Sequence, residues 1–311
     1  MRIGIAGCGR LTERGYVPAA RAAQEVEIVA LADPDRGRLQ RCRQLWAEGG
    51  EEAAGFPDVG SLLDAASIDL LVVAAPATHH LSVAAEAAEA GLRSLIEKPP
   101  APDLESTRRL AALDPQPLFA FNRRFLQGAE LIDAIPAEGW LELELELRFR
   151  REAWGAHQAQ DEALLDAGIH LIDLACFLTG SAPIAVRQAA LSRERASLEL
   201  ELGRGRARIR CATDRSHREE VTVRDRAGKV LARSAWGGVR SRLGGVLGKP
   251  DPLALSLQRQ LEALRDSARR SRQLASAADG ITVMTVFEAA QRSAQLSGAE
   301  VTVSTSEKTA A

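Results

Sequence analysis

Cysteine is scarce in this sequence, and no two cysteines stand close enough to suggest a shared metal ion or a disulfide framework. The four are Cys8, Cys42, Cys176 and Cys211, and none forms a C-x-x-C pair. This distribution argues against a zinc site and suits a reducing compartment. The chain opens on MRIGIAG, which lacks the charged start and apolar run of a secretory signal. We therefore expect a cytoplasmic protein.

The sequence also lacks a dominant charge and a long apolar run. Its 40 Lys and Arg residues and 42 Asp and Glu residues give a formal net charge of -2 at pH 7. This balance argues against nucleic acid or an anionic membrane as a partner, and no apolar stretch approaches the roughly 20 residues of a membrane helix. Arginines at 36–43 and 269–272 are interpreted as solvated helix faces. The 311 residues suffice for two domains, because one core usually stops growing near ~250–300 residues.

The first residues carry a nucleotide-binding pattern. A short apolar strand at 2–6 precedes Gly7-Cys8-Gly9-Arg10-Leu11-Thr12, a G-x-G-x-x-T variant of the dinucleotide fingerprint. The first glycine permits a tight turn, and the second lets the backbone approach a pyrophosphate at a helix amino end. Thr12 replaces the third glycine, which weakens the match and is expected to loosen the turn.

An acidic residue follows at the expected distance. Residues 26–33 form a second strand that ends in Asp33, where a carboxylate can accept hydrogen bonds from the adenosine ribose. Pro34 comes next rather than an arginine that would favour a 2′-phosphate, so NAD is favoured over NADP. The alternative for Asp33 is an ordinary turn acid before proline.

Further strands alternate with helices. Strands are expected at 68–76, 92–100 and 117–125, with a helix at 79–91. This order indicates a doubly wound parallel sheet, whose ligands bind at the carboxyl ends of the strands. The residues expected at those ends are Asp33, Pro76, Glu97, Lys98, Asn122, Arg123 and Arg124.

These motifs resemble the Gfo/Idh/MocA oxidoreductases, a family that includes glucose–fructose oxidoreductase and inositol dehydrogenase. The likeness is carried by the loop at Gly7, by P-x-x-x-H at 76–80, by E-K-P at 97–99, by N-R-R-F at 122–125, by LLDAGIHLIDL at 164–174 and by the closing segment 286–303. E-K-P followed about seventy residues later by D-x-G-x-H makes the resemblance specific. Ala77 departs from it, because the family often has asparagine there.

The resemblance implies a fold and a domain plan. It implies an amino-terminal Rossmann domain at 1–120 and a substrate and catalytic α/β domain with a mostly antiparallel open sheet at 121–303. Residues 304–311 are expected to be a frayed tail. Helices are also expected at 253–275 and 279–296, followed by a strand at 301–303.

The resemblance also assigns residues. It implies a catalytic group of Lys98, Asp166 and His170, and a cis Lys98–Pro99 bond. The expected cofactor-binding residues are Gly7, Gly9, Arg10, Leu11, Asp33, Pro76, His80, Glu97, Lys98 and Arg124. Further candidates for the substrate pocket are Asn122, Trp154, His157 and Asp173. The alternative is simple packing for Trp154 and His157, a capped or paired structural acid for Asp173, a surface ion pair for Arg124 and an ordinary residue at a helix start for His80.

The spacing of the catalytic motif suits alcohol oxidation. On a helix, Asp166 and His170 are four residues apart and lie on one face. Imidazole titrates near neutrality, so His170 can exchange the proton, while Lys98 can donate a hydrogen bond to the reacting oxygen. Asp166 can anchor a neighbouring hydroxyl or orient the histidine. A zinc reading is disfavoured because the lysine cation would oppose a metal, and a buried structural pair is the other alternative.

The second domain shows strict alternation at 140–150, 196–203 and 206–212, with leucines on one face and Glu or Arg on the other. A two-residue turn at Gly203-Arg204 would place Glu201 opposite Arg206 and Glu199 opposite Arg208. The resemblance implies association through this sheet, but a polar face predicts weak or salt-sensitive homo-oligomers. The Gly-rich segment 236–252 is either a lid for an anionic substrate or an ordinary loop.

We therefore expect an NAD-dependent dehydrogenase of a sugar, cyclitol or related polyol. Two alternatives remain at this point. One is a redox-neutral enzyme of the same fold that keeps NAD bound during elimination, hydrolysis or epimerisation. The other is a nicotinamide-sensing regulator, against which the intact catalytic group argues.

Overall fold

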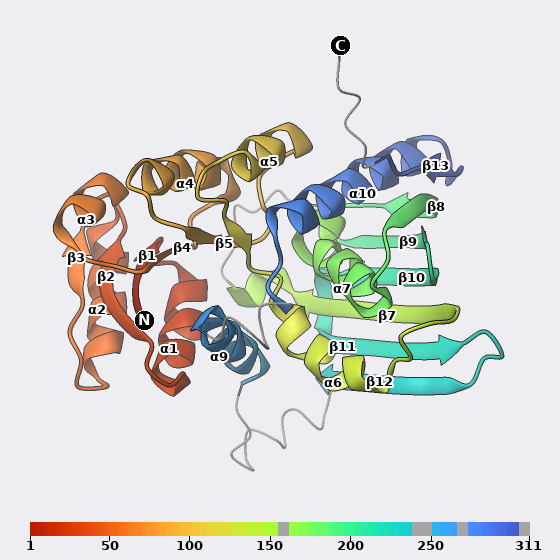
Figure 1. Ribbon diagram of the computed structural model, residues 1–311, viewed down its shortest axis with the longest axis horizontal. Coiled ribbons are helices and arrows are strands. Elements are labelled where there is room, and N and C mark those ends of the chain that lie inside the picture. Colours follow the sequence, from red (N-terminus) through yellow and green to blue (C-terminus); the bar gives the residue numbers. More distant parts are fainter. Residues whose placement is uncertain (155–161, 238–250, 266–272, 305–311) are drawn as a thin grey trace. The chain divides into compact units, whose positions relative to one another are not determined.

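The computed structural model describes residues 1–154, 162–237, 251–265 and 273–304, and the chain forms two compact units (Figure 1). The first unit comprises Met1–Phe125 and Pro250–Gly280, and the second comprises Leu126–Lys249 and Ile281–Ala311. The first unit thus draws on a late segment of the chain. The functional limits at 120 and 303 stay predictions.

The first unit contains a six-stranded sheet in which every pairing is parallel. Its strands, in spatial order, are β3 (Ala54–Phe56), β2 (Glu27–Ala32), β1 (Arg2–Ala6), β4 (Leu70–Val73), β5 (Ser94–Ile96) and β6 (Leu118–Phe119). This 3-2-1-4-5-6 order is that of a Rossmann sheet, whose ligand crevice lies where the order reverses, between β1 and β4. The predicted doubly wound sheet is confirmed.

The helices of this unit connect successive strands, except for α9, which comes from the late segment of the chain. They are the π-helix η1 (Thr12–Tyr16), α1 (Val17–Ala22), α2 (Arg36–Ala47), α3 (Val59–Ala65), the 3₁₀ turn η2 (Ala77–His79), α4 (His80–Glu89), α5 (Leu104–Ala111) and α9 (Pro252–Arg265). Three of them begin with an aspartate whose side chain accepts a backbone N–H of the first turn, at Asp35, Asp58 and Asp103. Such caps satisfy donors that the helix itself leaves unpaired.

One sequence expectation is wrong here, and some elements were not expected. The segment 117–125 is a strand only at β6, and Asn122–Phe125 forms the 3₁₀ turn η3 instead. The short strand β3 and the helices α3 and α5 had no counterpart in the sequence analysis. The helix α9 buries Leu257 and Leu261 in the core of the unit, which explains why this late segment belongs to it.

The second unit is built on a seven-stranded sheet. In spatial order its strands are β12 (Val230–Gly237), β11 (Asp214–Asp225), β7 (Leu141–Arg150), β10 (Gly205–Ala212), β9 (Arg195–Leu202), β8 (Pro183–Leu191) and β13 (Val301–Thr302). Only β10 and β7 pair in parallel, and the other neighbours are antiparallel. The expected mostly antiparallel sheet is confirmed, although β8, β11 and β12 were not foreseen.

The register of this sheet follows side-chain matching. In the β9–β10 hairpin Leu202 pairs with Gly205, Glu201 with Arg206 and Glu199 with Arg208, as the sequence predicted. The leucines of β7 are each 1% exposed, while its glutamates lie on the opposite face. A one-residue slip would exchange the two faces, which is why the alternation specifies the register so strongly.

The helical elements of the second unit are short except for two. They are α6 (Gln127–Leu131), the 3₁₀ turns η4 (Ile132–Ala134) and η5 (Arg151–Trp154), the π-helix η6 (Leu164–Gly168), α7 (Ile169–Thr179) and α10 (Ala277–Gln295), which begins in the first unit. In Figure 1, α7 lies over β7 and β10, against which it packs. It ends at Gly180, whose φ of 58° is in the left-handed region that glycine adopts most readily.

Within the described ranges, no helix combines the length and the apolar character needed to cross a membrane.

Candidate active site

The loop after β1 is shaped for close approach by a ligand. Gly7 has φ +104°, and a Cβ there would lie 2.6 Å from the carbonyl oxygen of Ala74, so only glycine fits. A Cβ on Gly9 would meet nothing within 4 Å, which leaves open space beside the backbone. The pair therefore provides the tight turn and the room that a dinucleotide pyrophosphate requires.

Thr12 stabilises this loop instead of loosening it, which corrects the sequence expectation. Its hydroxyl donates a hydrogen bond of 2.5 Å to the carbonyl oxygen of Gly7, and the residue is fully buried. The side chain that replaces the third glycine thus ties the start of η1 to the first glycine.

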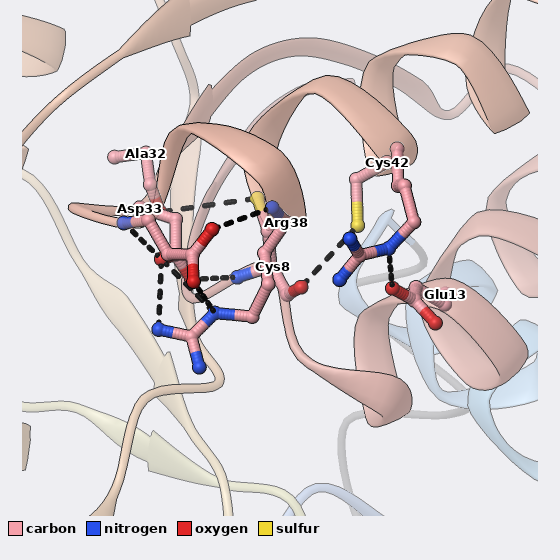
Figure 2. A network of polar contacts seen from close by, with 8 residues as sticks. Cys8, Glu13, Ala32, Asp33, Arg38 and Cys42 are labelled. Atoms are coloured by element: carbon pink, nitrogen blue, oxygen red, sulfur yellow. Dashed lines mark hydrogen bonds and ion pairs between the residues drawn. The ribbon is translucent and has the colours of Figure 1, made fainter.

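Asp33 lies at the end of β2 and connects three parts of the nucleotide site (Figure 2). Its Oδ2 accepts the backbone N–H of Cys8 at 2.8 Å, and its Oδ1 accepts the backbone N–H of Asp35 at 2.8 Å. Arg38 donates to the same Oδ1 from Nη2 and Nε, at 3.2 and 3.3 Å. The side chain of Asp33 is 6% exposed and that of Arg38 is 47% exposed.

The role of Arg38 was not expected from the sequence. The arginines at 36–43 were interpreted as one solvated helix face, and Pro34, directly after Asp33, was the position considered for a cation. The spacing of Asp33 and Arg38 could have indicated this ion pair. A side chain in the first turn of a helix can contact a carboxylate just before the helix. A second arginine of the same helix, Arg41, pairs with Glu13 of η1 at 3.2 Å.

Two buried thiols, Cys8 and Cys42, lie beside Asp33. A hydrogen bond with the Cys42 side chain and burial raise the pKa of Cys8 far above its usual range. The Cys42 thiol in turn donates to the carbonyl oxygen of Cys8 at 3.7 Å. Because thiolate is the reactive form of cysteine, the raised pKa makes Cys8 a packing residue.

Lys98 is the second residue after β5, at the carboxyl edge of the parallel sheet. The Lys98–Pro99 peptide bond is cis, as the resemblance implied. The preceding Glu97 is buried, and its two carboxylate oxygens accept the hydroxyl of Tyr16 at 2.6 Å and the backbone N–H of Lys98 at 3.1 Å. Burial raises the pKa of Glu97, and the Tyr16 hydroxyl and the Lys98 N–H oppose that rise.

His80 ties the end of β4 to the segment after Lys98. Its Nε2 lies 2.8 Å from the carbonyl oxygen of Ala75 and its Nδ1 lies 3.0 Å from that of Pro100. Burial lowers the pKa of His80, and a neutral imidazole can donate to only one of these two acceptors. Both nitrogens thus contact the protein backbone, and a place beside the nicotinamide stays a prediction.

The N-R-R-F segment forms contacts within the first unit. Arg124 is buried and pairs with Asp279 at 3.1 Å. Although burial opposes the shift, the charge of Arg124 helps to hold the pKa of Asp279 below its usual range. Arg123 donates to the side-chain oxygen of the buried Asn122 at 2.8 Å. The roles of Arg124 toward cofactor and of Asn122 toward substrate stay predictions.

In the second unit, the D-x-G-x-H motif crosses from a π-turn into an α-helix. Asp166 lies in η6 and His170 in the first turn of α7. The sequence predicted plain helical spacing, whereas the observed π-turn is wider and is frequently found at functional sites. His170 and Asp173 are 5% and 1% exposed.

Asp166 has a partner that the sequence analysis did not identify. Arg151, just after β7, donates from Nε to Asp166 Oδ2 at 3.0 Å, and the two side chains are only 11% and 16% exposed. The ion pair fixes one carboxylate oxygen. Several sequence predictions fall outside the described residues. They concern the side chain of Trp154, His157, the arginines at 269–272, most of the Gly-rich segment and nearly all of the expected tail.

In residues 1–154, 162–237, 251–265 and 273–304, no three His, Cys, Asp or Glu side chains are grouped so that they could hold a metal ion. Lys98 belongs to the first unit, and Asp166 and His170 belong to the second. Their action as one catalytic group is therefore a proposal, taken up below.

Comparison with known proteins supports the reading of the loop. Residues 1–116 match the model of the GFO_IDH_MocA family, described as an oxidoreductase family with an NAD-binding Rossmann fold. The resemblance stated from the sequence motifs is thereby confirmed.

Curated relatives match over part of their length. An inositol 2-dehydrogenase of Corynebacterium glutamicum (strain R) is 28% identical over 193 residues, which is 60% of this chain and 56% of that protein. A D-apiose dehydrogenase of Paraburkholderia graminis is 29% identical over 188 residues, 57% of this chain and 49% of that protein. The matched segments thus span about half the length of these relatives.

Solved structures match over nearly the whole chain. The myo-inositol dehydrogenase of Lactobacillus casei in complex with NAD(H) and myo-inositol aligns with a TM-score of 0.77, covering 100% of this chain and 98% of that one at 16% identity. At this level of identity the likeness establishes the fold, including that of the second unit.

Proposed function

We propose that this protein is an NAD-dependent oxidoreductase that transfers a hydride between the nicotinamide and a secondary alcohol or ketone of a polyol. The observation that carries the proposal is the E-K-P segment at the sheet's carboxyl edge, in a chain that also supplies the buried His170 four residues after Asp166. The first unit offers the fitted loop at Gly7 and Gly9 for the cofactor.

The chain's own residues would act as follows. His170 takes the proton from the alcohol oxygen, or returns it to the ketone, because imidazole exchanges protons near neutral pH. Lys98 donates a hydrogen bond to that oxygen and stabilises its partial negative charge. Asp166, held by Arg151 at 3.0 Å, accepts a hydrogen bond from a neighbouring substrate hydroxyl or orients the histidine. NAD, when bound, accepts the hydride.

NAD is the proposed cofactor in preference to NADP. The nearly buried carboxylate of Asp33 can accept a ribose hydroxyl and repels a 2′-phosphate. Arg38, which pairs with this carboxylate at 3.2 Å, is held by it and neutralises part of its charge. The proposed preference is therefore for NAD. Arg38 is the cation beside the proposed ribose position, and its charge is already paired with Asp33.

A cyclitol or a related sugar is the proposed substrate. The relatives are named as dehydrogenases of inositol and of D-apiose, compounds that present several adjacent hydroxyls. One acid/base, one cation and one further carboxylate suit such a substrate, because the reacting hydroxyl and its neighbour need separate partners. Fold alone does not select among polyols.

The test is a screen of cyclitols, aldoses, aldonates and nucleotide sugars with NAD and with NADP, followed by NADH absorbance and by product analysis. We expect NADH to accumulate in proportion to the polyol consumed. Product formed without NADH would instead favour the redox-neutral alternative, in which the cofactor stays bound. Binding of NAD without any turnover across the screen would favour the regulator.

A further inference from the structure

A buried tyrosine contacts the residue next to the proposed catalytic lysine. Tyr16 is the only tyrosine among the 311 residues, and it is fully buried. Its hydroxyl donates to Glu97 Oε1 at 2.6 Å, between residues 81 positions apart. The proposed chemistry uses neither side chain, so a polar pair in this core requires another explanation.

The carboxylate of Glu97 holds the lysine backbone. Its second oxygen, Oε2, accepts the N–H of Lys98 at 3.1 Å. The charged groups that act on this carboxylate are Lys98 and Arg123, in addition to the Tyr16 hydroxyl. Burying a carboxylate is costly unless its oxygens accept hydrogen bonds. Without the Tyr16 hydroxyl, Glu97 Oε1 would lose this hydrogen bond, and the side chain would be expected to turn toward another donor.

Tyr16 is also linked to the nucleotide loop. It is the last residue of η1, whose first residue, Thr12, donates its hydroxyl to the carbonyl oxygen of Gly7. A continuous series of contacts therefore runs from the loop glycine through one π-turn to Tyr16, Glu97 and Lys98. On the other side of the lysine, His80 contacts the carbonyl oxygen of Pro100 at 3.0 Å.

We propose that Tyr16 is a positioning residue for Lys98, and that through Glu97 it couples the nucleotide-binding loop to the orientation of the catalytic lysine. This inference rests on the proposed function for its catalytic part. The Tyr16–Glu97 bond itself makes predictions that need no activity. The competing explanation is that Tyr16 only fills the core.

The first experiment measures unfolding by denaturant as a function of pH for the wild type and Tyr16→Phe. Both are compared in a Glu97→Gln background. Because the hydroxyl lowers the pKa of Glu97 against burial, its removal raises that pKa further above the ordinary value of 4.5. When the pKa of a carboxyl group is higher in the folded than in the unfolded protein, the free energy of unfolding falls as pH rises through that range.

The denaturant concentration at the unfolding midpoint of Tyr16→Phe should therefore be close to that of the wild type at acidic pH. It should fall increasingly below the wild-type value as pH rises. In the Glu97→Gln background the effect of Tyr16→Phe should not depend on pH. A gap that is constant with pH in both backgrounds would overturn the proposed hold on Glu97.

The second experiment determines crystal structures of the wild type, Tyr16→Phe and Thr107→Val. Thr107 is the matched control because its buried hydroxyl donates to the backbone carbonyl oxygen of Asp103, the residue that caps α5. We expect Glu97 to turn and Lys98 to be displaced only in Tyr16→Phe. An unchanged Lys98 would overturn the positioning role even if the enzyme has no measurable activity.

The third experiment measures polyol oxidation. A displacement of the lysine by about 1 Å predicts a fall in kcat of roughly 10- to 100-fold, with the KM for the polyol much less affected. Adding Glu97→Gln to Tyr16→Phe should restore part of kcat, because a neutral amide does not draw the nearby cations. A wild-type kcat in Tyr16→Phe, or a fall no greater than in Thr107→Val, would contradict the inference. An inactive wild type would instead refute the proposed function.

Discussion

Cofactor preference offers the sharpest quantitative prediction, and Asp33→Ser is the perturbation. In the wild type, one nearly buried carboxylate accepts the N–H groups of Cys8 and Asp35 and the guanidinium of Arg38. Serine removes the charge that repels a 2′-phosphate and frees Arg38 to bind one. The substitution should therefore weaken the use of NAD and improve the use of NADP.

The magnitude follows from the bonds exchanged. A hydrogen bond to a charged group contributes about 1.5–3 kcal/mol, which corresponds to roughly 10- to 100-fold in kcat/KM. NAD loses one such bond to its ribose, and NADP gains one from Arg38. Since Arg38 is 47% exposed, its contribution belongs at the lower end because water screens it. The ratio of kcat/KM for NAD to that for NADP should fall by about 100- to 1,000-fold.

The assay compares initial rates with both cofactors for the wild type, Asp33→Ser and Asp33→Ser/Arg38→Ala. The double variant is the control, because it should lose the gain with NADP while keeping the loss with NAD. A ratio in Asp33→Ser within about threefold of the wild type would refute the assignment of Asp33 to the ribose. An equal gain with NADP in the double variant would refute the role of Arg38.

Three further predictions concern stability and assembly. Arg151→Met removes one partner of a largely buried pair and should lower the free energy of unfolding by about 2–3 kcal/mol; a loss below ~0.5 kcal/mol in denaturant titrations would contradict this. Asp279 has a lowered pKa, so its stabilising contribution is present above the ordinary 3.8 and is lost as pH falls. The deficit of Asp279→Asn should therefore shrink in acid, and a deficit that grows there would argue against the pair with Arg124. Self-association through the polar sheet face should weaken with salt in sedimentation experiments, and an oligomer that persists in molar salt would refute this.

The polar face of the second unit's sheet could be predicted because polar and apolar residues alternate along its strands. Its ion pairs include Arg206–Glu142 at 2.7 Å, Arg208–Glu199 at 2.9 Å and Arg187–Glu201 at 2.7 Å. Because side chains alternate with a period of two, the sequence of each strand already separates the buried leucines from the charged residues. The hairpin register then followed from matching charges. The β7–β10 pairing, which is parallel and links strands far apart in sequence, could not be obtained in this way.

Motifs located the candidate site, but not the side chains that support it. Residue type and spacing were enough to identify the glycine loop, Lys98 and the D-x-G-x-H segment in the sequence. The partners Tyr16 and Glu97, or Arg151 and Asp166, meet only after the chain has folded, and nothing in their local sequence marks them. The π-turn at η6 also escaped prediction, since its composition suits an α-helix equally well.

The most direct test of the proposed catalytic group is the rate of NADH formation by His170→Ala, measured beside the affinity of the variant for NADH. Loss of the acid/base should lower kcat by roughly 100- to 10,000-fold, while the dissociation constant for NADH stays within about twofold of the wild-type value. Turnover by His170→Ala at the wild-type rate would contradict the assignment of the proton transfer to this histidine.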